Sequence, residues 1–144
     1  MIPDSDDIAR HCKGSWIQED GRVSSNAFKL RPNESYLSVS WLDFWGKESS
    51  EENLEETRKA FKRKGFELRK SARFAVAQVG VMCDAVATES QGKTIEVLHE
   101  PDVPHDESHS GIYNTASIEA LEEAVVAEII AAVITPDQIF PAIE

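Results

Sequence analysis

Cysteine and long apolar runs are scarce in this sequence of 144 residues. Its two cysteines, Cys12 and Cys83, lack the CxxC spacing of metal and redox sites, and a disulfide framework needs more of them. We therefore expect free thiols and a cytoplasmic location. The first residues lack the basic and apolar regions of a secretory signal, and the longest apolar stretch, 124–134, is too short to span a membrane.

The sequence also lacks the motifs that define several large enzyme classes. It contains no GxSxG, GxxxxGKS/T or GxGxxG pattern. The serine-hydrolase, P-loop and dinucleotide-binding classes are set aside, because their defining residues are missing. No remaining motif fixes a reaction.

Basic residues are few, 15 against 26 acidic ones, which gives a net charge of −11. This charge argues against nucleic acid as a partner, because phosphate binding needs a basic surface. The bases are nevertheless concentrated, since eight of them lie between Arg58 and Arg73 with Glu67 as the single acid. Such a polarised surface can dock an acidic partner. The contact residues of this predicted basic patch are Lys62, Arg63, Lys64, Arg69 and Lys70.

The periodicity of apolar residues predicts one α+β domain over residues 1–144, since neither a repeat nor a linker divides the chain. We expect a mainly antiparallel sheet of about four or five strands, with a long C-terminal helix and one or two shorter helices packed on it. Segments 72–87 and 94–99 are expected to pair as a hairpin. The expected strands are 27–30, 36–42, 66–70, 72–87 and 94–99, and the expected helices are 6–13, 49–65 and 117–134.

The helix over 49–65 has the clearest end signals. Ser49 followed three residues later by Glu52 is the pattern of a capping box, and Gly65 can end the helix. Apolar residues at helical spacing form a narrow stripe that should face the sheet. This stripe is Leu54, Thr57 and Phe61.

The helix over 117–134, with Ser117 as its cap, has more apolar surface than one buried face requires. One stripe should cover the sheet. A second lies on the side that carries Glu119 and Glu123, where a surface helix should be polar. Either another part of this chain covers it or a protein partner does. The first stripe is Ile118, Leu121, Val125, Ile129 and Ala132, and the second is Val126, Ile130 and Ile134.

These surfaces support our first hypothesis, a small cytosolic interaction module or a subunit of a larger assembly. It would bind a protein partner, or a second copy of itself, through the second stripe, the basic patch, or both. No cofactor is expected in this case. The aromatic segment 41–45 is either the edge of the core or a further anchor for a partner.

Three of the four histidines fall between residues 99 and 109. His105 and His109 are four residues apart, the spacing at which helical zinc sites place two imidazoles. This supports a second hypothesis, a metal- or histidine-dependent hydrolase with zinc as its cofactor. Its residues are His99, His105 and His109 as ligands or acid and base groups, with Asp106 or Glu107 activating water.

A plainer interpretation of the same stretch stays open. In the HDESH segment the glutamate comes one place later than in the metalloprotease pattern HExxH, which points it away from the histidine pair. Pro101 and Pro104 stiffen the chain, and polar residues are what an exposed connection contains. The stretch can therefore also be a polar connection that leads into the last helix.

Overall fold

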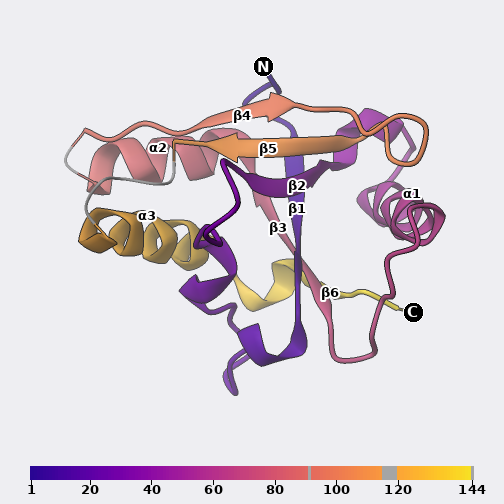
Figure 1. The fold of residues 1–144 in the computed structure, drawn as a ribbon, viewed down its shortest axis with the longest axis horizontal. Coiled ribbons are helices and arrows are strands. Elements are labelled where there is room, and N and C mark those ends of the chain that lie inside the picture. The colour runs from indigo at the N-terminus through magenta and orange to yellow at the C-terminus, as the bar shows by residue number, and fades with distance from the viewer. Residues whose placement is uncertain (91, 115–119, 144) are drawn as a thin grey trace.

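The structure, a computed structural model, describes residues 1–90, 92–114 and 120–143. Its α+β class agrees with the sequence, and the described residues form one antiparallel sheet of six strands in the order β4-β5-β2-β1-β3-β6 (Figure 1). In these ranges no helix is both long enough and apolar enough to cross a membrane. The strands are β1 (Asp7–Cys12), β2 (Leu37–Trp41), β3 (Arg73–Gln78), β4 (Glu96–His99), β5 (His109–Tyr113) and β6 (Ile139–Pro141). The helices are α1 (Ser50–Arg63), α2 (Val79–Glu89) and α3 (Ala120–Val133), with short 3₁₀ helices η1 (Gly14–Trp16), η2 (Ser25–Phe28), η3 (Leu42–Trp45) and η4 (Pro136–Gln138).

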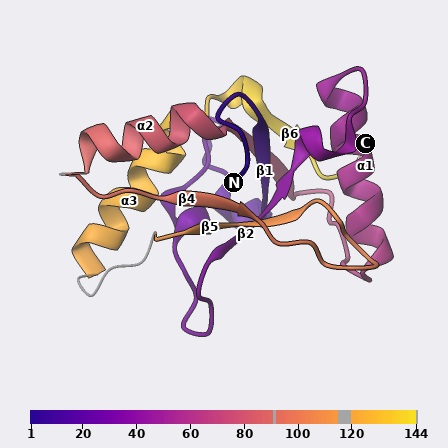
Figure 2. The same cartoon turned by 90° about the horizontal axis from the view of Figure 1, so that it is seen from above.

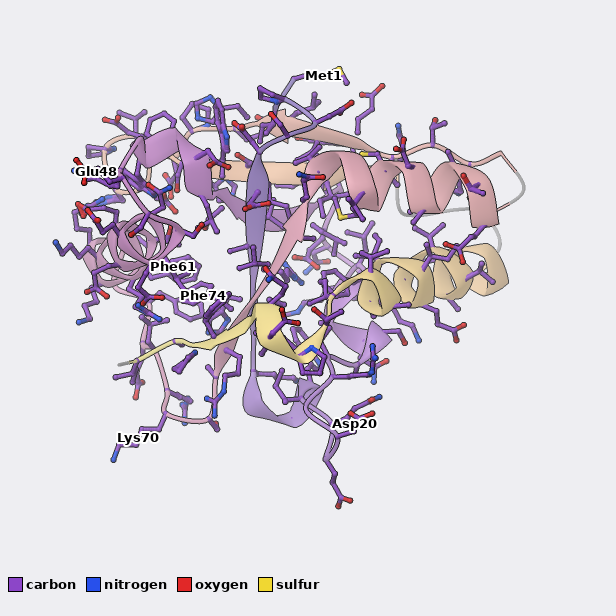
Figure 3. All side chains as sticks on the ribbon, turned by 180° about the vertical axis from the view of Figure 1, so that it is seen from behind. Met1, Asp20, Glu48, Phe61, Lys70 and Phe74 are labelled. Atoms are coloured by element: carbon purple, nitrogen blue, oxygen red, sulfur yellow. The ribbon has the colours of Figure 1, made fainter. Side chains whose placement is uncertain are left out.

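Helices cover both faces of the sheet, with α2 and α3 on one side and α1 on the other (Figure 1 and Figure 2). The larger core fills the space between the sheet and the α2 and α3 pair, and it includes Ile8, Met82 and Ile130. A smaller core lies under α1. There the ring centres of Phe61 and Phe74 are 5.2 Å apart, and the two side chains point toward one another (Figure 3).

The segment predicted as a first helix, 6–13, is instead the strand β1. Its side chains alternate, since Ile8 and Cys12 face the larger core and Ala9 faces the smaller one. β1 pairs antiparallel with β2 on one side and with β3 on the other. The helix prediction was wrong because capping and charge order describe local preference, whereas two neighbouring strands require an extended backbone to bond to.

Three predicted strands were also assigned wrongly. Residues 27–30 fall in and after η2, and residues 66–70 form an irregular connection. The run 72–87 divides into β3 and the helix α2. In α2 the buried residues lie three and four places apart, which is helical spacing hidden in a run rich in valine and alanine. They are Val79, Met82 and Val86.

The predictions for α1 and for the strand over 36–42 are confirmed. The Ser49 hydroxyl accepts a hydrogen bond from the backbone N–H of Glu52 at 3.1 Å, and Gly65 follows the helix with a φ of 77°. All three residues of the predicted stripe of α1 are buried. The strand β2 lies within 36–42, and its Leu37 and Val39 side chains belong to the larger core.

The segment 94–99 contains β4, as predicted, but β4 pairs with β5 and not with the strand in 72–87. β5 lies inside the histidine-rich stretch, where no strand was expected. β6 was not predicted either, so a count of four or five strands was too low. The predicted long C-terminal helix differs as well, because α3 has 14 residues, as α1 does, and β6 follows it. The expected cap Ser117 and the stripe residue Ile118 lie outside the described residues.

The second apolar stripe of α3 is covered by this chain itself. Its three residues, Val126, Ile130 and Ile134, are 1%, 0% and 1% exposed and belong to the larger core. In the first stripe Ile129 is buried, but Val125 is 38% exposed and Ala132 is also exposed. The rotation of α3 about its axis is set by α2 and η2, against which it packs. The second stripe therefore offers no exposed surface to a partner.

The same substitution at two adjacent valines tests how α3 is rotated about its axis. Val126→Ala should lower the free energy of unfolding by about 2 kcal/mol, because it removes buried methyl groups and leaves a cavity. Val125→Ala removes the same atoms from an exposed position and should lower it by less than about 0.5 kcal/mol. Urea denaturation measures both values. Equal losses in the two variants would contradict the observed orientation of α3.

Candidate functional site

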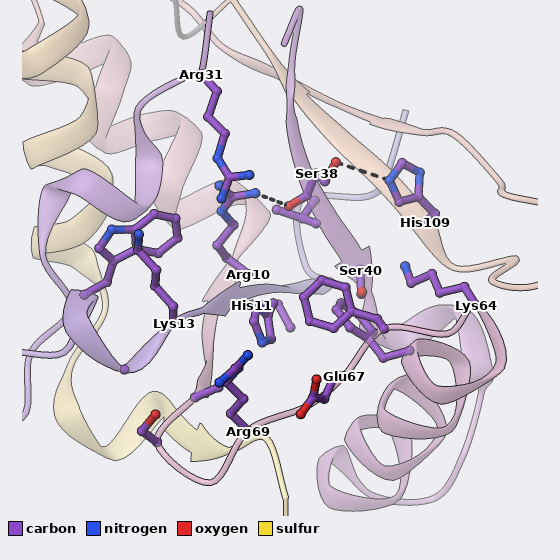
Figure 4. A pocket seen from close by; sticks show the side chains of 18 of the residues that line it. Arg10, His11, Lys13, Arg31, Ser38, Ser40, Lys64, Glu67, Arg69 and His109 are labelled. Carbon is purple, nitrogen blue, oxygen red and sulfur yellow. Dashed lines mark hydrogen bonds between the residues drawn. The ribbon is translucent and has the colours of Figure 1, made fainter. Parts of the chain in front are cut away.

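The sheet is open between β1 and β2. β1 pairs with β3 from Asp7 to Cys12, but with β2 only at Ile8 and Ala9. Beyond Ala9 the two strands separate, and a cavity of about 450 Å³ lies between them (Figure 4). Its walls come from β1, β2, β5, the end of α1 and the connections 13–16, 31–34 and 64–72.

Arg10 of β1 lies at the floor of this cavity. Its Nε donates a hydrogen bond to the Ala27 carbonyl at 2.9 Å, and its Nη1 donates to the Ser38 carbonyl at 2.8 Å. Arg10 is 8% exposed and forms no ion pair with any carboxylate in the described part of the chain. Burial lowers the pKa of the guanidinium, which nevertheless stays protonated. Its hydrogen bonds thus go to neutral carbonyls, and the nearby Glu34 carboxylate stabilises its charge without forming an ion pair with it.

Four further cations line the cavity. Figure 4 shows Arg31 extending toward Arg10, so that the two guanidinium groups lie near one another. Lys64, at the end of α1, forms an ion pair of 3.1 Å with the buried carboxylate of Asp106. The lining carboxylates are fewer, and a chain of net charge −11 therefore has a cationic cavity. The remaining lining cations are Lys13 and Arg69, and the lining carboxylates are Glu34 and Glu67.

Aromatic rings give the cavity apolar walls. Trp16 of η1 forms one wall, and the Nζ atom of Lys13 lies 5.0 Å from the centre of a Trp16 ring. Phe61 and Phe66 also line the cavity, where the Nζ atom of Lys64 lies 4.2 Å from the Phe61 ring centre. Cations next to apolar rings suit a ligand that carries both a negative charge and an apolar group.

His11 of β1 adds a neutral imidazole to the wall. Its ring centre lies 5.6, 4.8 and 5.7 Å from those of Phe61, Phe66 and Phe74. Its Nε2 atom is buried and has no hydrogen-bond partner among the described residues. Burial, followed by the charges of Arg10 and Lys64, lowers the pKa of His11 to about 4. The imidazole is therefore uncharged at neutral pH.

Only some residues of the predicted basic patch line the cavity. Lys64 and Arg69 line the cavity, whereas Lys62 and Lys70 are exposed and lie outside it. Lys70 projects away from the fold (Figure 3). Arg63 donates from its Nε to the His105 carbonyl at 3.1 Å, so its side chain connects α1 to the turn after β4.

The three predicted histidines do not come together as a metal site. The Nε2 atom of His99 lies 2.6 Å from the Glu107 carbonyl, and His105 is exposed. His109 alone lines the cavity. Within the described ranges no group of three or more His, Cys, Asp or Glu side chains is placed to hold a metal ion.

The two acidic residues of that hypothesis have different surroundings. Asp106 is fully buried, where its carboxylate pairs with Lys64 and accepts hydrogen bonds from the Ser108 N–H and hydroxyl at 3.1 and 2.6 Å. Through these bonds the Asp106 carboxylate stabilises the turn between β4 and β5. The Glu107 side chain is exposed. Neither carboxylate faces a histidine pair.

The cysteines are free, as expected, and neither is a reactive thiol. Cys12 is fully buried, and burial raises its pKa to about 12. Cys83 lies on α2 and burial raises its pKa too. A thiolate nucleophile is therefore not available near neutral pH at either position.

The aromatic segment 41–45 belongs to the edge of the core, which was one of its two predicted alternatives. Trp41 and Trp45 are half-buried, and their indole N–H groups donate to the Asp6 carboxylate at 2.9 Å and to the Thr57 hydroxyl at 3.2 Å. The ring centres of Trp41 and His99 are 5.0 Å apart. Contacts within the chain thus account for both indoles.

Several cavity residues were missed from the sequence, chiefly Arg10, His11, Arg31 and Ser38. The helix predicted over 6–13 gave Arg10 and His11 no place in the sheet. The signal would have been a charged residue within the alternating apolar pattern of a strand, because buried charges mark functional sites or contacts with partners. Arg31 and Ser38 carried no signal of their own.

Comparisons of this chain with protein-family models, curated protein sequences and solved structures found no match. The cavity and its lining residues are therefore the features from which a function can be inferred.

The shifted pKa of His11 makes the fold sensitive to acid. The imidazole of the unfolded chain takes up a proton near pH 6.5, whereas that of the folded protein does so only near pH 4. Between these values the unfolded state binds more protons, so the free energy of unfolding falls as the pH is lowered from about 6.5 to about 4.

His11→Phe removes this contribution and suits the aromatic surroundings. Urea denaturation at about pH 7 and about pH 5 should show a smaller acid-induced loss of stability in the variant than in the natural protein. The same loss in both proteins would show that His11 is not held neutral by the fold.

Proposed function

We propose that this protein binds a small organic anion in the cavity between β1 and β2. The observation that carries the proposal is the buried guanidinium of Arg10, which forms no ion pair with a carboxylate of the described residues and lies near that of Arg31. Like charges held close together repel. An anion bound against both groups offsets the repulsion and adds to the counter-charge that Glu34 supplies without an ion pair.

The size and walls of the cavity define the ligand class. Sites for small molecules have volumes of roughly 300 to 1,000 Å³, and this cavity of about 450 Å³ lies in that range. Arginine favours carboxylate and phosphate groups, because its planar fork can donate two parallel hydrogen bonds to them. Trp16, Phe61 and Phe66 suit an apolar group. The ligand is a carboxylate or phosphate attached to a compact ring or chain.

This proposal keeps one part of the interaction-module hypothesis. An acidic ligand is still the expected partner of the basic segment, and Lys64 and Arg69 contribute to the cavity that receives it. The exposed bases Lys62 and Lys70 remain a proposed contact surface for an acidic protein. The buried stripe of α3 supports no partner, so it is not part of the proposal.

Phenyl phosphate tests the site, since it combines a dianion with one ring. We expect isothermal titration calorimetry to detect binding of phenyl phosphate but not of phenol. Arg31→Gln should weaken the binding about tenfold, because it removes a charge-assisted hydrogen-bond donor from the cavity. Added salt should weaken it as well.

Lys62→Gln is the matched control, because it removes an exposed cation that lies outside the cavity. It should change the dissociation constant by less than about twofold. An absence of phenyl phosphate binding, or equal losses in the two variants, would contradict an anion site in this cavity.

A further inference from the structure

A serine and a histidine face each other at one end of the cavity. Ser38 of β2 is paired with Gly111 of β5, and Ser40 is paired with His109. Ser38 and His109 are therefore diagonal neighbours on one face of the sheet. The Ser38 Oγ and His109 Nε2 atoms are 3.4 Å apart (Figure 4). Both residues line the cavity, and Ser38 is exposed.

The second ring nitrogen of His109 determines which one carries the proton. Nδ1 lies 2.7 Å from the carbonyl oxygen of Glu100. A carbonyl can only accept a hydrogen bond, so Nδ1 of the neutral imidazole carries the hydrogen and Nε2 has the free electron pair. The Ser38 hydroxyl thus faces the basic nitrogen. A nucleophile, a base and a group that orients the base are the three parts of serine-dependent catalysis, with a carbonyl here in the orienting role.

The imidazole is held in this orientation from two sides. On one side the Tyr36 ring lies next to the imidazole, with 6.1 Å between the two ring centres. Glycine at position 111 makes room for the Tyr36 ring, because a Cβ atom there would overlap it. On the other side the Glu100 N–H donates to the His109 carbonyl at 2.9 Å, which fixes the backbone next to the orienting carbonyl. A fixed base lowers the entropy that must be lost before reaction.

We propose that Ser38 and His109 act as nucleophile and general base in the cleavage of an ester that carries an anionic group. The inference rests on the proposed function, because the cations of the cavity hold that group. The Ser38 oxygen attacks the ester carbonyl carbon while His109 Nε2 takes the hydroxyl proton. The bond from the carbonyl carbon to the alkoxy oxygen breaks, and His109 returns the proton to the leaving alcohol. Water, deprotonated by His109, then releases the acid and restores Ser38.

The surrounding charges favour this step. Negative charge develops on the carbonyl oxygen as the tetrahedral intermediate forms, and groups already fixed in place stabilise such charge most effectively. Arg10, Arg31 and Lys64 line the same cavity as the pair. The missing GxSxG motif does not bear on Ser38, because that motif places serine on a strand-to-helix turn and Ser38 lies within a strand.

The compound 4-acetoxybenzoate tests the pair, since it carries a carboxylate and an acetyl ester on one ring. We expect mass spectrometry of the full chain to find an acetyl group on Ser38, and 4-hydroxybenzoate to be released. Ser38→Ala and His109→Gln should each lower the release at least about a hundredfold. The acetyl group on the unaltered protein decides the outcome even if a variant fails to fold.

Two matched controls carry the same substitutions outside the cavity. Ser35→Ala and His105→Gln change an exposed serine and an exposed histidine that do not line it, and both should keep the rate of the natural protein. Acetylation found only on lysines, or acetylation of Ser38 that is undiminished in His109→Gln, would contradict the proposed roles of Ser38 and His109.

The methyl ester of 4-acetoxybenzoate separates this inference from the proposed function, because it lacks the charge. Faster acetylation of Ser38 by the charged compound supports both. Equal rates of acetylation with the two compounds would support the proposed roles of Ser38 and His109 and contradict anion binding in the cavity. Binding of phenyl phosphate without acetylation of Ser38 would support anion binding and contradict the proposed roles of Ser38 and His109.

Discussion

The hydrogen bonds of Arg10 hold the sheet together where its own hydrogen bonding stops. β1 leaves β2 after Ala9, and the guanidinium then donates to one carbonyl of η2 and to one of β2. Without these donors the Ala27 and Ser38 carbonyls would lose partners, at about 1 to 3 kcal/mol for each group left buried and unpaired. One side chain of β1 therefore fixes the position of two segments that lie 17 and 28 residues further along the chain.

This arrangement stabilises the backbone but leaves Arg10 without a carboxylate at ion-pair distance, and Glu34 stabilises its charge without forming an ion pair. A carboxylate beside Arg10 would have compensated the buried guanidinium, yet the described residues place another guanidinium, that of Arg31, near it. Local unfavourable features of this kind persist where the surrounding fold is stable enough to hold them, and they concentrate at functional sites. The cavity thus combines a structural cation with an excess of positive charge, which the proposed anion would offset.

The end of α1 fixes the other side of the cavity. Lys64 pairs with the buried carboxylate of Asp106, and Arg63 donates to the His105 carbonyl, so both residues connect α1 to the turn between β4 and β5. That turn leads directly into His109. At the opposite edge of the sheet Arg58 of α1 donates to the Pro141 carbonyl at 3.2 and 2.7 Å. The basic segment, which the charge pattern indicated as a docking surface, therefore also carries structural contacts that position the site.

Features that depend on neighbouring residues could be predicted from the amino-acid order alone. The ends of α1 follow from Ser49, Glu52 and Gly65, and the strand over 36–42 follows from alternation within one segment. The α+β class and the free cysteines follow from composition and periodicity in the same way. These properties are local, so the chain order is enough to predict them.

The contacts between residues distant in the sequence became known only from the three-dimensional fold. Hydrogen bonds from β2 and β3 make 7–12 a strand, and packing against α2 and η2 selects the buried stripe of α3. The histidine-rich stretch was identified from the sequence, but the partner of His109 was not, because Ser38 lies 71 residues away. Strand register brings the two together, and register results from contacts across the whole sheet that no short segment encodes.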